Sequence, residues 1–268
     1  MPSQIERALR WIMRLSVVGV VLAFGAVVPA IAQANAPRIA AASDLKFALD
    51  EVIAAFNKET GLVVVPTYGS SGNFKTQIIQ GAPFQLFMSA DEGFVFGLDD
   101  KGLTVDRGGL YAIGRIVLFA PKGANWQPDS QLAGFKAALA DGRVTRFAIA
   151  NPEHAPYGRA AQEALMTSGL WDAVRQRLVF GENVSQAAQF AASGSTQGGI
   201  FALSLALAPQ MAQLGTYALI PAELHQPLRQ RMVLLKSADD VTRAFYHYAQ
   251  SASARAVLKR YGFLLPGE

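Results

Sequence analysis

Residues 62–81 read LVVVPTYGSSGNFKTQIIQG, and the middle of this stretch decides how the chain folds. The first part is rich in β-branched residues, which favour a strand, and the last part has the apolar spacing of a helix that ends at Gly81. Between them lies YGSSGNF, Tyr68–Phe74, which taken alone reads as a flexible linker. Because it joins a strand directly to a helix, we instead predict a strand-to-helix junction of an α/β fold.

The same alternation of strand and helix patterns continues along the chain. Strand-like runs are expected at residues 38–43, 84–90, 114–121, 146–151, 177–182 and 231–236. Helix-like runs are expected at residues 44–60, 159–169, 183–193 and 239–263, while residues 198–207, GGIFALSLAL, fit either pattern. This alternation predicts an α/β fold with mostly parallel sheets. The chain is longer than one modest sheet needs, so two lobes are expected.

The first 34 residues have the layout of a secretory signal peptide. Three arginines precede an apolar run at residues 15–32, and small-x-small sites follow, so cleavage is expected after Ala32 or Ala34. The alternative is an uncleaved membrane anchor, because the apolar run could nearly span a bilayer. Two glycines and a proline interrupt the run and favour the signal peptide. The expected location of the mature chain is the periplasm.

The composition excludes several classes of protein. With 51% hydrophobic and 16% charged residues, the chain can bury a sizeable core and is not expected to be disordered. The formal net charge of +4 falls to about +2 without residues 1–34, and no concentrated basic patch is visible, so nucleic acid is not an expected partner. The absence of cysteine excludes disulfides, cysteine nucleophiles, cysteine metal sites and a lipid-anchored cysteine.

Four strand-to-helix junctions have the features of an anion-binding site. In a parallel α/β sheet ligands bind at the carboxyl ends of strands, where helix starts offer free backbone N–H groups and a partial positive charge. The residues at these junctions are Ser43 in AAASDL, Ser70 and Ser71 in YGSSGNF, Tyr157 in PEHAPYGRAA, and Val184 in GENVSQAA. Each junction taken singly also fits an ordinary helix cap, worth about 1 kcal/mol to its own helix. The pattern leaves open whether the four converge.

Several segments, in this order and spacing, resemble the periplasmic molybdate-binding proteins of ABC uptake systems. They are AAASDL, YGSSGNFKTQIIQGAP, LFMSAD, NPEHAPYGRAAQEAL, GENVSQA and LKRYGF, and the likeness runs roughly from Arg38 to Phe263. The resemblance implies a two-lobed type II periplasmic binding protein fold, with a mixed, mostly parallel sheet flanked by helices in each lobe. It places lobe I at residues 35–117 and 233–268 and lobe II at residues 118–232.

The same resemblance implies a ligand and a set of binding residues. The family binds a tetrahedral oxyanion, molybdate or tungstate, between the lobes and delivers it to an inner-membrane ABC permease. The matching groups here are the hydroxyls of Ser43 and Ser71, the backbone N–H groups of Tyr157 and Val184, and, as possible further contacts, Ser70 and Ala42. No cofactor, catalytic residue or side-chain metal ligand is expected, and the protein is expected to be a monomer.

Two positions depart from the family pattern. Ala202, in GGIFALS, stands where some members have a tyrosine whose hydroxyl is a further donor, and Gln85 stands where many members have aspartate. A pocket made only of hydrogen-bond donors suits a fully ionised dianion such as molybdate, tungstate or sulfate, whereas a protonated phosphate needs an acceptor. The spacing of the donors must then separate molybdate from sulfate.

One alternative keeps the fold and changes the ligand to sulfate, phosphate or a small organic acid. A carboxylate ligand usually needs an arginine clamp, for which Arg115 and Arg159 are the candidates.

A remote alternative is a secreted serine hydrolase that uses Ser43, Ser71, Asp44 and His154. The segment YGSSGN does not fit the G-x-S-x-G nucleophile motif, so we do not expect an enzyme.

Overall fold

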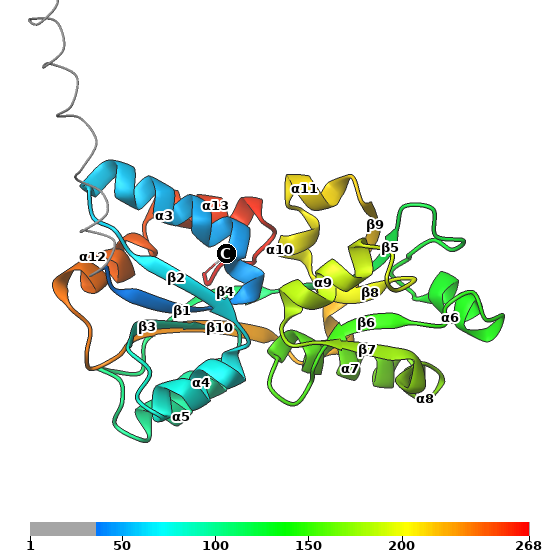
Figure 1. The fold of residues 1–268 in the computed structure, drawn as a ribbon, viewed down its shortest axis with the longest axis horizontal. Helices are drawn as coiled ribbons and strands as arrows, with labels where there is room; N and C mark the ends of the chain where they lie inside the picture. Colours follow the sequence, from blue (N-terminus) through cyan, green and yellow to red (C-terminus); the bar gives the residue numbers. More distant parts are fainter. Residues whose placement is uncertain (1–35, 268) are drawn as a thin grey trace, which may run out of the picture. The chain divides into compact units, whose positions relative to one another are not determined.

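The computed structural model describes residues 36–267 and contains two five-stranded sheets with helices packed on them (Figure 1). The predicted signal peptide lies outside the described residues. Within the described part of the chain, none of the helices combines the length and apolar character needed to cross a membrane. The predicted fold class, α/β with two mixed and mostly parallel sheets, is confirmed.

The first sheet has the strand order β2-β1-β3-β10-β4. Its strands are β1 (Arg38–Ala42), β2 (Val65–Gly69), β3 (Phe84–Ser89), β4 (Gly109–Gly114) and β10 (Leu228–Leu234). Four of them run in one direction and β10 runs against them, since it pairs antiparallel with both β3 and β4. Its helical segments are η1 (Ser43–Leu45), α3 (Lys46–Thr60), α4 (Ser71–Ile79), α5 (Glu92–Asp99), α12 (Asp240–Tyr248) and α13 (Ala252–Arg260).

The second sheet repeats this arrangement with the order β7-β6-β8-β5-β9. Its strands are β5 (Ile116–Pro121), β6 (Phe147–Ala150), β7 (Leu178–Gly181), β8 (Gly199–Ala202) and β9 (Gly215–Leu219), of which β5 runs against the others. Its helical segments are α6 (Ala133–Ala140), α7 (Pro156–Thr167), α8 (Trp171–Val174), η2 (Arg175–Arg177), α9 (Val184–Ala192), α10 (Leu203–Ala206), α11 (Pro209–Ala212) and η3 (Ala222–Leu224).

Apolar side chains fill the space between sheets and helices. On the first sheet, α3 and α13 cover one face and α4 and α5 the other (Figure 1). Phe56 of α3 meets Phe245 of α12 edge-on with ring centres 5.2 Å apart. In the second sheet Phe135 of α6 lies 4.3 Å from Phe147 of β6, ring centre to ring centre. Burial of such large side chains stabilises each layer by about 1.5–3 kcal/mol per residue.

The chain crosses between the sheets twice, at places that differ from the predicted lobe boundaries. The expected strand 114–121 corresponds to β5, and the preceding strand β4 ends at Gly114, so the chain crosses between the sheets at Arg115. The second predicted boundary, after residue 232, falls inside β10, whose pairing with the first sheet already begins at Leu228. The sequence pattern does not show that the strand starts at Leu228, because Arg229 and Arg231 interrupt the apolar run of β10. The division into lobes that move against each other stays a prediction.

Residues 198–207, which fit either pattern, contain both elements. Gly199–Ala202 form β8 and Leu203–Ala206 form α10, so the run is a further strand-to-helix junction. The sequence also missed β4 and β9. β9 is half-exposed along its length, so its apolar signal is weak, while β4 has a glycine at each end, which weakens its strand pattern.

Candidate functional site

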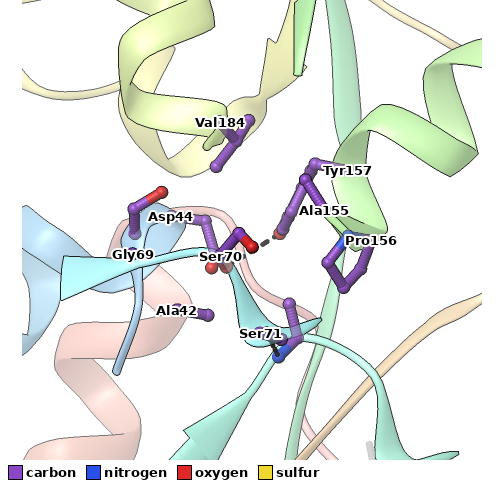
Figure 2. Close-up of a pocket in the computed structure, with 11 residues that line it drawn as sticks. Ala42, Asp44, Gly69, Ser70, Ser71, Ala155, Pro156, Tyr157 and Val184 are labelled. Carbon is purple, nitrogen blue, oxygen red and sulfur yellow. Dashed lines mark hydrogen bonds between the residues drawn. The ribbon is translucent and has the colours of Figure 1, made fainter. Parts of the chain in front are cut away.

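The four predicted strand-to-helix junctions converge on one small cavity (Figure 2). Each follows the carboxyl end of a parallel strand: β1 and β2 in the first sheet, β6 and β7 in the second. The cavity is lined by Ala42, Ser43, Asp44, Gly69, Ser70, Ser71, Ala90, Ala155, Pro156, Tyr157 and Val184. All six residues singled out from the sequence are among them. Their placement at the cavity does not by itself assign them a role in binding.

The second sheet contributes two helix N-termini to the cavity. Asn183 caps α9 and its side chain accepts hydrogen bonds from the backbone N–H groups of Ser185 and Gln186, both at 3.1 Å. Val184 is the first residue of α9, and Tyr157 the second of α7, so their N–H groups have no acceptor within the helix. These two donors and the positive ends of the helix dipoles suit an anion.

The first sheet contributes two buried serine hydroxyls that already serve as acceptors. The Ser71 hydroxyl accepts from the Ala90 N–H at 3.0 Å, and the Ser43 hydroxyl accepts from the Ser185 N–H at 3.3 Å. Within residues 36–267 neither hydroxyl donates a hydrogen bond to a protein acceptor. Each therefore keeps its proton available for an acceptor in the cavity.

Ser70 differs from Ser71 because its hydroxyl is already engaged. It lies 2.9 Å from Nδ1 of His154 and donates to the His154 carbonyl oxygen at 3.1 Å. It also caps α4 by accepting from the Asn73 N–H at 3.4 Å. Of the two neighbouring serines, Ser71 is thus the one with a free donor.

Segments of the two sheets touch each other at the rim of the cavity. The Gly72 N–H donates to the His154 carbonyl oxygen at 3.0 Å, and the Asn73 side-chain amide donates to Glu182 Oε1 at 2.6 Å. Gly72 is required for this approach, because a Cβ atom at its position would lie 2.6 Å from that same carbonyl oxygen. The sequence did not predict this contact of His154.

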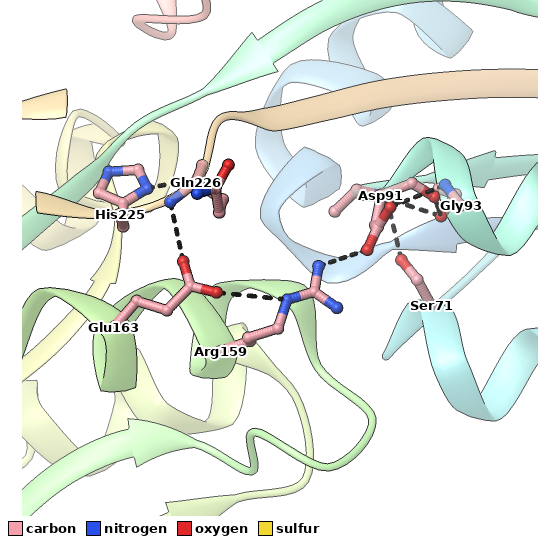
Figure 3. A network of polar contacts seen from close by, with 9 residues as sticks. Ser71, Asp91, Gly93, Arg159, Glu163, His225 and Gln226 are labelled. Atoms are coloured by element: carbon pink, nitrogen blue, oxygen red, sulfur yellow. Dashed lines mark hydrogen bonds and ion pairs between the residues drawn. The ribbon is translucent and has the colours of Figure 1, made fainter. Parts of the chain in front are cut away.

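A second contact between the sheets is an ion pair that Figure 3 shows from close by. Arg159 of α7 pairs with Asp91, which caps α5, and also lies 3.9 Å from Glu163. Glu163 in turn accepts from the Gln226 N–H at 2.8 Å. Arg159 is occupied by these carboxylates and does not line the cavity.

The other candidate for an arginine clamp, Arg115, is also used elsewhere. Its Nε donates to the Gly262 carbonyl oxygen at 2.9 Å. No lysine, arginine or histidine of the described chain lines the cavity. An organic acid held by an arginine clamp therefore does not fit this cavity.

Asp44 is the only charged side chain among the described residues that line the cavity, and it is 1% exposed. Its Oδ2 accepts from the Tyr157 hydroxyl at 2.9 Å, drawn in Figure 2, and from Nε2 of Gln230 at 2.7 Å. The side-chain Oε1 of Gln230 accepts from the Tyr111 hydroxyl at 2.7 Å. This buried network joins the first sheet to α7, and the sequence considered Asp44 only as a hydrolase residue.

The electrostatics of this network follow from its burial. Burial raises the pKa of Asp44 to about 6, against 3.8 for an unperturbed aspartate, and the hydrogen bonds from Gln230 and Tyr157 offset only part of the rise. Burial and the nearby Asp44 carboxylate raise the pKa of Tyr157 and of Tyr111 well above the ordinary value. Both phenols therefore remain hydrogen-bond donors at neutral pH.

The two departures from the family pattern lie away from the cavity lining. Ala202 ends β8 and is fully buried, but it is not a lining residue. Gln85 lies in β3, and its side-chain Oε1 accepts from the Asp239 N–H and the Thr242 hydroxyl, each at 2.8 Å. Gln85 therefore holds α12 on the sheet and has no direct part in the cavity.

The hydrolase and metal alternatives find no geometry to support them. The His154 ring contacts Ser70 and Glu182, not Ser43 or Ser71. The Asp44 carboxylate is bound by Tyr157 and Gln230, as described above. Over residues 36–267 no group of three or more His, Cys, Asp or Glu side chains is placed to hold a metal ion.

Comparison with known proteins assigns the chain to a family. The family model of the bacterial extracellular solute-binding protein matches residues 37–264. The molybdate-binding protein ModA of Azotobacter vinelandii is 33% identical over 94% of this chain and 99% of its own length. ModA of Escherichia coli (strain K12) is 30% identical over 92% of this chain and 96% of its own length.

A solved structure gives the same result for the fold. The periplasmic molybdate-binding protein of Azotobacter vinelandii superimposes with a TM-score of 0.77 and 32% identity, covering 86% of this chain and 99% of that one. The resemblance predicted from the sequence is confirmed by these matches. The chain therefore belongs to the bacterial extracellular solute-binding proteins, a family of binding proteins and not of enzymes.

Proposed function

We propose that this protein captures molybdate, and also tungstate, in the cavity between its two sheets and delivers the oxyanion to an ABC permease. The observation that carries the proposal is the set of four donors that meet there without any basic side chain: two free serine hydroxyls and two helix N-termini. The names of the relatives support the choice of molybdate. In this proposal the protein contacts only the oxygens of the ligand and makes no bond to the metal atom.

The chemistry of the donors explains why a dianion is the ligand. The hydroxyls of Ser43 and Ser71 and the N–H groups of Tyr157 and Val184 belong to residues that line one cavity, and in this proposal each donates to an oxygen of the tetrahedral anion. Hydrogen bonds to a charged group contribute about 1.5–3 kcal/mol each. Five to seven of them would give sub-micromolar affinity after the costs of association, so the four donors named here account for part of the binding.

Thermal unfolding with different oxyanions tests the ligand directly. At about 100 times its Kd a ligand stabilises the folded protein by about 2.7 kcal/mol, which raises the Tm of a domain of this size by roughly 5–10 °C. We expect this shift with molybdate and tungstate, but not with sulfate or phosphate at equal concentration and ionic strength. If sulfate or phosphate shifts the Tm and molybdate and tungstate do not, the proposed ligand is wrong.

Capture requires the two sheets with their helices to close on the anion, in the manner of hinge motions around ligands. The contacts at the cavity rim, from Gly72 to His154 and from Asn73 to Glu182, belong to the closed state in this proposal. The lobes that move are then bounded by the sheet crossings, at Arg115 and between β9 and β10.

Gly72→Ala is expected to weaken molybdate binding by roughly 5- to 100-fold. The added methyl group would overlap the His154 carbonyl oxygen only in the closed state, and overpacking of this kind costs about 1–3 kcal/mol. Gln77→Ala, on the exposed face of the same helix, is the matched control and should bind as the unmodified protein does. Isothermal titration of both variants measures the effect. Unchanged affinity of Gly72→Ala would contradict the role of this contact in closure.

The remaining steps of uptake concern location and partners. We infer that the mature chain acts in the periplasm as a monomer, after removal of the signal peptide predicted at residues 1–34. The closed, loaded form would dock on the permease. The family description, an extracellular solute-binding protein, supports this location.

A further inference from the structure

One oxygen in the cavity has no role in the proposed function. Asp44 lines the cavity, yet its Oδ1 is buried and has no hydrogen-bond partner in the described chain. An unpaired, ionised carboxylate beside a bound dianion would repel it, because both charges would lie in a site of low dielectric constant. A protonated carboxyl group would instead present a hydrogen-bond donor.

The hydrogen bonds around Asp44 determine which oxygen can hold a proton. The Tyr111 hydroxyl donates to the side-chain Oε1 of Gln230, so the amide nitrogen Nε2 of Gln230 points to Asp44. Oδ2 thus accepts from Gln230 and from the Tyr157 hydroxyl at the same time. A proton on the carboxyl group therefore resides on Oδ1, the oxygen left without a partner.

We infer that Asp44 takes up one proton from solvent when the oxyanion binds, and that its Oδ1–H then donates a hydrogen bond to the anion. The inference rests on the proposed function, since it concerns the same cavity. One proton from solvent binds the Asp44 carboxylate when the anion binds, and no other covalent bond changes. Release of the anion returns this proton to solvent.

The surroundings of Asp44 make this proton uptake feasible. The groups that face it are Tyr111 from β4, Tyr157 from α7 and Gln230 from β10, while Ser204 from α10 donates to its backbone carbonyl oxygen at 2.7 Å. No lysine, arginine or histidine of the described residues lines the cavity beside it to hold the carboxylate ionised. The pKa of Asp44 is already raised to about 6 by burial, and a neighbouring dianion raises it further.

Isothermal titration with molybdate in buffers of different ionisation enthalpy measures the proton uptake. Between about pH 7 and about pH 9 the unmodified protein should take up about one proton per anion, and its Kd should rise about tenfold per pH unit. Asp172→Asn, at a largely exposed carboxylate, is the matched control and should leave both quantities unchanged.

Two substitutions at Asp44 separate its donor role from its charge. In Asp44→Asn the amide oxygen keeps the bonds from Tyr157 and Gln230, and the amide N–H₂ takes the place of the protonated Oδ1. This variant should bind molybdate with no proton uptake and a Kd that does not vary over this pH range. Above about pH 7 it should therefore bind more tightly than the unmodified protein. Asp44→Ala should also be independent of pH, but weaker than Asp44→Asn by roughly 10-fold, because the donor is lost.

Different outcomes overturn different conclusions. Molybdate binding without proton uptake in the unmodified protein would overturn the role of Asp44 and leave the proposed function intact. If the protein prefers phosphate and loses that binding in Asp44→Asn, the proposed role of Asp44 as a donor is also overturned. Asp44 would then be an acceptor for a protonated anion. Absence of any molybdate or tungstate binding would overturn both.

Discussion

Replacing both Ser43 and Ser71 by alanine is expected to weaken molybdate binding by roughly 10²- to 10⁴-fold. Each serine would lose one hydrogen bond to a charged ligand, worth about 1.5–3 kcal/mol. Because both bonds would go to the same anion, the two losses need not add, so the lower figure is the firmer expectation. Isothermal titration of the two single variants and the double variant measures the loss and the coupling between the serines.

The controls for this prediction are a serine outside the cavity, Ser237, and a cavity-lining serine whose hydroxyl is already engaged, Ser70. Ser237→Ala removes a hydroxyl that donates to the Phe84 carbonyl oxygen at 3.0 Å, away from the cavity lining, and should not change the affinity. Ser70→Ala should act differently from Ser71→Ala, because it removes a helix cap and a contact with His154 and leaves the free donor in place. Wild-type affinity in the double variant would show that these hydroxyls do not bind the anion.

Asp44→Asn is expected to stabilise the ligand-free protein by up to about 3 kcal/mol above about pH 6. The pKa of Asp44 is about 6 in the folded protein and 3.8 when unperturbed, so the folded state binds the proton more tightly than the unfolded state. Stability therefore falls as the pH rises from about 4 to about 6, and the full cost of ionising the buried carboxyl is present above that range. The amide of the Asp44→Asn variant cannot ionise, so the stability of the variant does not fall over this pH range.

Denaturant unfolding of the two proteins at a series of pH values measures the difference. Near pH 4 the two should be about equally stable, since Asp44 is then protonated in the folded state, and the gap should open toward pH 7. Asp172→Asn, at an exposed side chain, should show no such gap. A gap that does not change with pH would mean that packing, and not ionisation, causes the difference.

Much of the fold could be predicted because it depends on neighbours in the chain. The strand and helix patterns before and after YGSSGNF are confirmed by β2 and α4. The prediction was wrong where tertiary structure overrides the local pattern. β10 begins at Leu228 although Arg229 and Arg231 interrupt its apolar pattern, because pairing with β4, which lies far away in the sequence, already starts there.

The candidate site was predictable in part for the same reason. Ser70, Ser71 and Asn183 could be placed at helix starts, since capping involves residues within one turn of each other. The roles of Gln85 and of His154 could not be predicted, because their partners lie far away in the sequence. Gln85 binds the start of α12, and His154 binds Ser70.

The sequence by itself indicated four helix starts at the ends of strands, and the order of these motifs identified the family. Of the four, α4 and α9 have side-chain caps, whereas η1 and α7 have none. Only the tertiary structure decided which groups are free. Ser70 is engaged by a histidine 84 residues away, which leaves Ser71 as the donor. Asp44 is buried by Tyr157 and Gln230, 113 and 186 residues distant. The groups that surround a hydroxyl or carboxyl in space decide whether it is protonated and whether its proton is free to donate. The local sequence specifies only the backbone on which that side chain is placed.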